Sequence, residues 1–124
     1  MPLINVSTGE LLDKWSILEI KLSEFTSHEK KSIISTEMEY LKQDVHCLLE
    51  LSEVNTQYLR LKLVNSQIWR GMDSLYAFDK NLKDDFIALT NEITELNMQR
   101  AHIKREIDLL TRSQIMETKS FIDE

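Results

Sequence analysis

Two polar residues interrupt otherwise apolar helical stripes, and their positions could support ligand binding. Asn65 interrupts one stripe and Arg100 another. Asn97 and Lys104 lie one helical turn to either side of Arg100. Like charges at i, i+4 repel, so an anion between Arg100 and Lys104 would relieve that repulsion. Trp69 follows Asn65 by four residues, on the same helix face. If the two helices pack together, the candidate residues for binding a small phosphate or carboxylate are Asn65, Trp69, Asn97, Arg100 and Lys104.

The same residues also have a structural interpretation, which we favour. A lone Asn in a helical seam often fixes the register or the oligomeric state. A buried polar group costs free energy unless it is paired. Lys104 can reach Asp108 at i+4. Arg100 can pair with a carboxylate of the first predicted helix, for which the candidates are Glu10, Asp13 and Glu19.

Other arrangements of reactive side chains are weak. Glu50-x-x-Glu53 and Glu92-x-x-Glu95 each place two carboxylates on one helix face. All-helical nucleotide pyrophosphohydrolases hold Mg²⁺ with such pairs, but here the two pairs are far apart in the chain and no third element supports them. No two of the three histidines have the spacing of metal ligands on a helix. We therefore expect no catalytic residue, no metal site and no cofactor.

Composition and charge exclude several classes of protein. The chain has 124 residues and a formal net charge of −6, which disfavours a nucleic-acid partner and an anionic membrane surface. There is no run of 18 apolar residues to span a membrane, and the N-terminus does not resemble a secretory signal. The only cysteine is Cys47. We expect it to be a small buried apolar residue in a protein of the reducing cytoplasm.

The elements that must position these residues are helices. The chain contains one Pro and two Gly, too few for the turns of a β-sandwich or barrel or for a Gly-rich nucleotide loop. Apolar residues recur at alternating spacings of three and four, which predicts amphipathic helices. We predict an all-α protein, a four-helix antiparallel bundle or long helical hairpins with coiled-coil-like stripes. It forms one domain over 1–124, with a short extended lead-in, helices at about 8–25, 28–51, 55–77 and 82–112, and a tail at 113–124.

Local signals mark the ends of these helices. Ser7-x-x-Glu10 is a capping box, and Thr26-x-x-Glu29 is a candidate second one. Ser52 and Asn55 are plausible caps for a third helix. Gly71 lies inside that helix, where glycine costs about 1 kcal/mol relative to alanine. Its presence indicates either close packing against another backbone or fraying of the helix end.

The helix lengths bear on assembly. At 1.5 Å per residue the first helix is about 27 Å long and the fourth about 45 Å. In a monomeric bundle the apolar stripe of the long helix would extend beyond its short neighbour. Exposed apolar stripes usually find partners. We therefore expect a homodimer in which long helices pack against each other.

Several segments carry a resemblance to a known family. The opening Gly9–Lys14 (GELLDK) and Ile17–Lys21 (ILEIK) resembles that of a family of small bacterial all-helical proteins of unknown function. Trp15 and the pair Gly71-Met72 depart from the family pattern. The resemblance implies an all-helical fold and no particular activity. Further matching segments follow in the same order, namely Asn65–Trp69, Phe86–Leu89, Asn97–Ile107 and Glu117–Phe121.

Two functions follow from these observations. We favour a non-enzymatic helical interaction or scaffold protein that acts as a homodimer and docks another protein. The alternative is a binding protein or minor enzyme for a small anionic metabolite, which would use the helix face formed by Asn97, Arg100 and Lys104.

Overall fold

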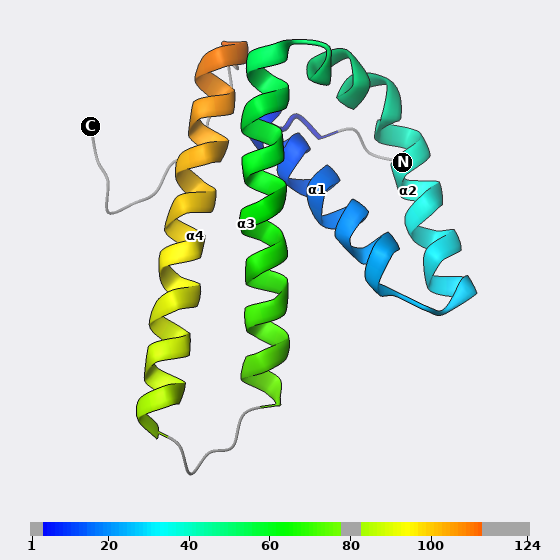
Figure 1. Ribbon diagram of the computed structural model, residues 1–124. Helices are drawn as coiled ribbons and strands as arrows, with labels where there is room; N and C mark the ends of the chain where they lie inside the picture. Colours follow the sequence, from blue (N-terminus) through cyan, green and yellow to red (C-terminus); the bar gives the residue numbers. More distant parts are fainter. Residues whose placement is uncertain (1–3, 78–82, 113–124) are drawn as a thin grey trace.

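The described part of the chain forms four α-helices, which are arranged as two helical hairpins. The computed structural model describes residues 4–77 and 83–112, in which no strand occurs. The predicted all-α class is confirmed. Figure 1 shows α3 and α4 side by side as a long antiparallel hairpin, with α1 and α2 forming a second, shorter hairpin that leans away from it. The helices are α1 (Thr8–Glu24), α2 (His28–Leu49), α3 (Ser52–Tyr76) and α4 (Lys83–Thr111).

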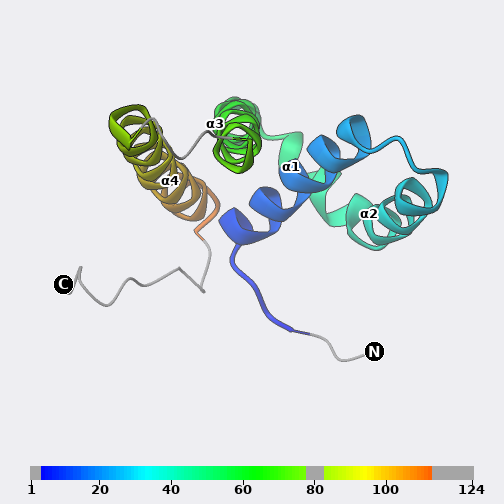
Figure 2. The same ribbon diagram turned by 90° about the horizontal axis from the view of Figure 1, so that it is seen from below.

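Helix α1 is the centre of the arrangement. It contacts each of the other three helices, and the end-on view shows it between α2 and the long hairpin (Figure 2). Its buried side chains therefore point in several directions around the helix, in contrast to the single stripe that the sequence predicts. The main apolar core consists of Leu12, Trp15, Val45, Val54, Tyr58, Leu61, Val64, Ile103 and Ile107.

One predicted N-cap is confirmed and the second is wrong. The Ser7 hydroxyl accepts a hydrogen bond from the Glu10 backbone N–H at 3.1 Å. At the start of α2 the capping residue is Ser27, whose hydroxyl accepts from the Lys30 N–H at 3.4 Å. The predicted Thr26 box is wrong because the next residue, Ser27, also carries a hydroxyl and is the N-cap instead. The helix therefore begins one residue later than that box requires.

The predicted break between the second and third helices is present, but its caps are not the predicted ones. Helix α3 begins at Ser52, with Leu51 as an N-cap that makes no side-chain capping bond. The Asn55 N–H already donates to the Leu51 carbonyl, at 2.9 Å. Val54 is buried in the core, so packing of the first turn fixes the start of α3 without a polar cap.

The environment of Gly71 differs from the one predicted. Helix α3 continues past Gly71 to Tyr76 without fraying. A Cβ atom at Gly71 would lie 3.0 Å from the Ile93 side chain of α4, so the close contact is with a side chain and not with a backbone.

The prediction that Cys47 is buried is wrong, because Cys47 is exposed. It follows the buried Val45 by two positions, which places it on the opposite face of α2.

The apolar stripe of α4 is buried over only part of its length. Ile93, Ile103 and Ile107 are buried, but Phe86 is 42% exposed. Helix α1 lies against the part of the hairpin that holds the C-terminal end of α4, and the other end extends beyond it (Figure 1). No helix within residues 4–77 and 83–112 has the length and apolar character needed to cross a membrane.

Candidate functional site

A group of buried and partly buried polar residues lies where α1 crosses the long hairpin. Glu10, Asp13 and Ser16 follow one another at intervals of three on α1 and share one helix face. Arg100 and Lys104 form an i, i+4 pair on α4, and Asn65 projects from α3. These six residues are called the Asp13 cluster below, and they are Glu10, Asp13, Ser16, Asn65, Arg100 and Lys104.

Asp13 is the acceptor at the centre of this cluster. Its side chain is 2% exposed. Arg100 Nε donates to Asp13 Oδ1 at 2.8 Å, and Arg100 Nη2 donates to Asp13 Oδ2 at 2.5 Å. The planar guanidinium therefore binds both carboxylate oxygens, the geometry in which an arginine and a carboxylate interact most strongly. One of the three pairings predicted for Arg100 is thus the one observed.

Asn65 joins α3 to the same carboxylate. Its Nδ2 donates to Asp13 Oδ1 at 2.9 Å and to Ser16 Oγ at 2.7 Å. The Ser16 hydroxyl in turn donates to the Asp13 backbone carbonyl at 2.7 Å. An amide nitrogen has two hydrogens, and each has an acceptor here. The interruption of the α3 stripe by Asn65 is therefore matched by polar groups of α1.

Lys104 completes the cluster on the side of the α1 N-terminus. Its Nζ lies 2.8 Å from Glu10 Oε2 and 4.0 Å from Asp13 Oδ2. The Lys104 side chain is buried. The two carboxylates of α1 thus balance the two cations of α4, so the cations face neighbouring carboxylates of their own chain.

Gly9 lies at a close approach between α1 and α4. Its N–H donates to Asp108 Oδ1 at 2.7 Å. The carboxylate thereby satisfies one of the free N–H groups at the start of α1, where the helix dipole also favours a negative charge. A Cβ atom on Gly9 would lie 2.3 Å from the Lys104 carbonyl oxygen, so only glycine fits. Sequence reasoning missed this role, and the signal available was a glycine in a capped first turn.

Two of the five predicted ligand-binding residues lie outside the cluster. The Asn97 side chain donates to the Ile93 carbonyl of its own helix at 3.2 Å. The Trp69 ring packs edge-on against Phe25, with ring centroids 6.1 Å apart. The structure therefore brings Asn65, Arg100 and Lys104 together around a carboxylate that the prediction did not include among the ligand-binding residues.

A second polar contact, which the sequence did not reveal, joins α1 to α3. The hydroxyl of the buried Tyr58 donates to Glu19, whose other oxygen lies 3.5 Å from Lys62 Nζ. Burial, followed by the hydrogen bond and the charge of Glu19, raises the pKa of Tyr58 well above its usual value. Tyr58 therefore serves as a protonated donor.

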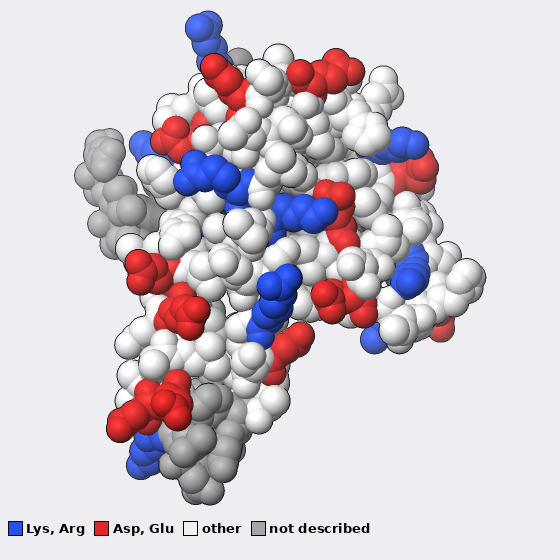
Figure 3. Space-filling view, viewed as in Figure 1, with Lys and Arg blue, Asp and Glu red and all other residues white. Residues whose placement is uncertain are grey.

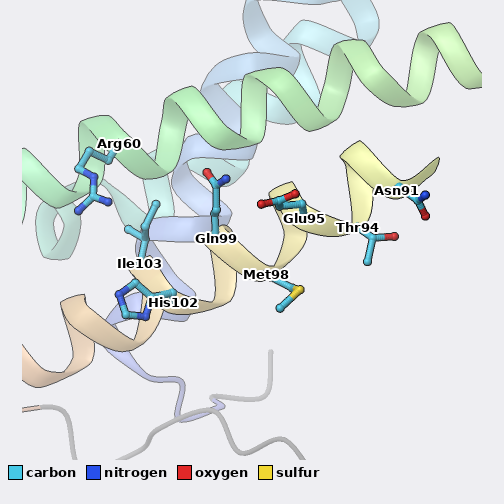
Figure 4. Close-up of a pocket in the computed structure, with 8 residues that line it drawn as sticks. All are labelled: Arg60, Asn91, Thr94, Glu95, Met98, Gln99, His102 and Ile103. Carbon is cyan, nitrogen blue, oxygen red and sulfur yellow. The ribbon is translucent and has the colours of Figure 1, made fainter. Parts of the chain in front are cut away.

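An open groove runs along α4. It has a volume of about 550 Å³. Figure 4 shows Arg60 reaching into it from α3, while the other lining residues belong to α4. Among residues 4–77 and 83–112 no group of three or more His, Cys, Asp or Glu side chains could hold a metal ion. The lining residues are Arg60, Asn91, Thr94, Glu95, Met98, Gln99, His102 and Ile103.

Comparison with known proteins identifies a family and no activity. The model of a family of unknown function, DUF6165, matches residues 3–123. The chain belongs to this family. No curated protein and no solved structure matches the chain significantly. Membership of DUF6165 confirms the predicted resemblance to a family of unknown function, and the function must be argued from the residues.

Proposed function

We propose that this DUF6165 member is a non-enzymatic helical interaction protein that acts as a homodimer and docks another protein. The observation that carries the proposal is the pairing of Arg100 with Asp13. Its guanidinium binds both oxygens of Asp13, so the cation best placed to bind a ligand is engaged in holding two helices together. The polar residues at the helix crossing thus stabilise the packing of the helices.

Exposed apolar side chains support an interaction role. Leu59 and Leu63 are exposed on α3, as are Ile87, Met98 and Leu109 on α4. Apolar side chains gathered along a helix face commonly mark sites of protein–protein contact. The proposal includes a cytoplasmic location, because a chain with one cysteine cannot form an internal disulfide and suits a reducing compartment.

Sedimentation velocity over a range of protein concentrations tests the homodimer. We expect a species of twice the 14.6 kDa chain mass at micromolar concentration. A species of the single-chain mass at every concentration would overturn the homodimer.

The alternative is a protein that binds a small anionic metabolite through Asn97, Arg100 and Lys104, and a thermal-unfolding screen with phosphate, nucleotides and dicarboxylates tests it. A ligand at 100 times its dissociation constant stabilises the native state by about 2.7 kcal/mol. Asn97→Ala is the informative variant, because Asn97 is exposed and bonds only to its own helix among the contacts described. A stabilising ligand whose effect Asn97→Ala removes, without lowering the Tm of the free protein, would favour this alternative.

A further inference from the structure

The outward face of α4 carries a regular row of apolar side chains. Ile87, Met98 and Leu109 are 56%, 69% and 54% exposed, and successive members are eleven residues apart. Eleven residues make three turns plus about 20°, so the three side chains form a nearly straight row. The buried Ile107 follows Met98 by nine residues, half a revolution around the helix. The row therefore lies directly opposite the face that α4 buries in its own chain.

This row is symmetric about Met98. Ile87 and Leu109 stand at equal distances on either side of Met98. Asn91 and Arg105, both polar, stand seven residues away on either side. In a twofold symmetric contact, residue i of one copy meets residue j of the other, and j meets i. Two antiparallel copies of α4 crossing at Met98 would place Ile87 against Leu109 of the partner subunit.

The charges of α4 favour the same antiparallel arrangement. Before Met98 the helix has one lysine and four acidic residues. After Met98, Arg100 and Lys104 pair with carboxylates of α1 and Asp108 is buried. The charged residues left to face a partner there are Arg105, Glu106 and Arg112, so this half is the more basic one. Acidic side chains gather over the N-terminal part of α4 on the face seen in Figure 3. An antiparallel pair places the acidic half of each copy beside the basic half of the other, while a parallel pair would place like charges together.

The groove beside the row provides room for a second helix. Met98 and His102 line the groove from α4 and Arg60 lines it from α3. In Figure 4 Met98 points away from α3, while Gln99 points toward it. A helix that packs on Met98 at the usual interaxial distance of about 8–10 Å would cover this open side of the long hairpin.

We propose that two copies of the chain pair through α4, antiparallel, about a twofold axis beside Met98. This inference rests on the homodimer proposed above and specifies its interface. The occupant of the outward face of α4 is a second copy because the apolar row and the charges of the helix complement themselves when one copy is reversed.

Disulfide trapping at Met98 tests the position of the axis. In a Cys47→Ser background, Met98→Cys places one thiol per chain at the proposed axis, where the two thiols meet. We expect oxidation to convert most of the protein to a covalent dimer on a non-reducing gel. Asn97→Cys in the same background is the matched control, because its side chain is also exposed but points about 100° away. Equal cross-linking of the two variants would overturn the proposal.

A mixing experiment tests the direction of the two helices. Ile87→Cys and Leu109→Cys chains, both in the Cys47→Ser background, carry tags of different size and are oxidised together. In the antiparallel pair position 87 meets position 109 of the partner, whereas identical positions are about 33 Å apart, far beyond disulfide reach. We expect only the mixed-size dimer. Dimers of each variant with itself would show a parallel pair and overturn the proposal.

Sedimentation of the reduced variants separates this inference from the proposed function. The variants could sediment as dimers when reduced and yet, when oxidised, give neither the Met98→Cys cross-link nor the mixed dimer. That result would overturn the α4 interface and leave the homodimer standing. If the unmodified chain sediments as a monomer, the homodimer and its interface both fail.

Discussion

Replacing Asp13 with asparagine removes the charge at the centre of the Asp13 cluster while keeping the size of the side chain. The variant loses one of the two hydrogen bonds to Arg100, because an amide keeps only one acceptor oxygen. It also leaves the buried Lys104 with one carboxylate neighbour fewer. Breaking a buried ion pair by removing one partner costs about 3–5 kcal/mol. The Arg100 side chain is 28% exposed, and water screens part of that loss. We expect the free energy of unfolding to fall by about 2–4 kcal/mol.

Urea unfolding followed by circular dichroism at the helix band measures this loss. For a chain of this length a loss of about 3 kcal/mol lowers the Tm by roughly 10 °C. Asp44→Asn is the matched control, because Asp44 is exposed on α2 and its replacement should change stability by less than about 0.5 kcal/mol. A double-mutant cycle with Arg100→Gln should show that the two losses are not additive. A loss for Asp13→Asn no larger than that of the control would refute the reasoning that the Asp13 cluster joins α1 to α4.

Three further predictions concern Gly9, Tyr58 and Cys47. Gly9→Ala should lower the free energy of unfolding by more than about 2 kcal/mol in the same urea assay, because the new Cβ would lie 2.3 Å from the Lys104 carbonyl oxygen; unchanged stability would contradict this close approach. The raised pKa of Tyr58 predicts that stability is full below the ordinary tyrosine value of 10.0 and falls as the pH rises above it, since only the unfolded chain then ionises this residue. Tyr58→Phe should reduce this fall, and an identical pH profile in the variant would count against it. Cys47 is exposed, so the native protein should react with a thiol reagent at the rate of the urea-unfolded chain, and protection in the native state would contradict that exposure.

The helices could be predicted from the sequence because a helix that buries one face has apolar residues at regular spacings of three and four. Ser7 could be predicted as a cap because its accepting hydroxyl and the Glu10 N–H that donates to it lie three residues apart. Arg100 could be matched to a carboxylate of the first helix, since an unpaired buried arginine is too costly. Choosing Asp13 from three candidates required the rotation of α1 about its axis, which periodicity alone does not fix.

The remaining features depend on contacts between residues distant in the chain. Nothing near Gly9 in the sequence indicates that the Lys104 backbone lies against it. Asn97 and Trp69 were grouped with Arg100 on helical spacing, but spacing along α4 and α3 does not say which sides of the two helices meet. Cys47 shows the same limitation, because its residue type favours burial while its position on α2 exposes it.

The contacts of α1 also determine when the chain can fold. Helix α1 is synthesised before the other three helices, all of which it contacts, and its Gly9 bonds to a residue 99 positions later. Contacts this distant close a large loop, and they slow folding because chain entropy is lost before they form. During synthesis α1 must wait for the last turns of α4, so the polar face of Asp13 stays in water until then. Docking of α1 onto the long hairpin is therefore possible only after α4 has been synthesised.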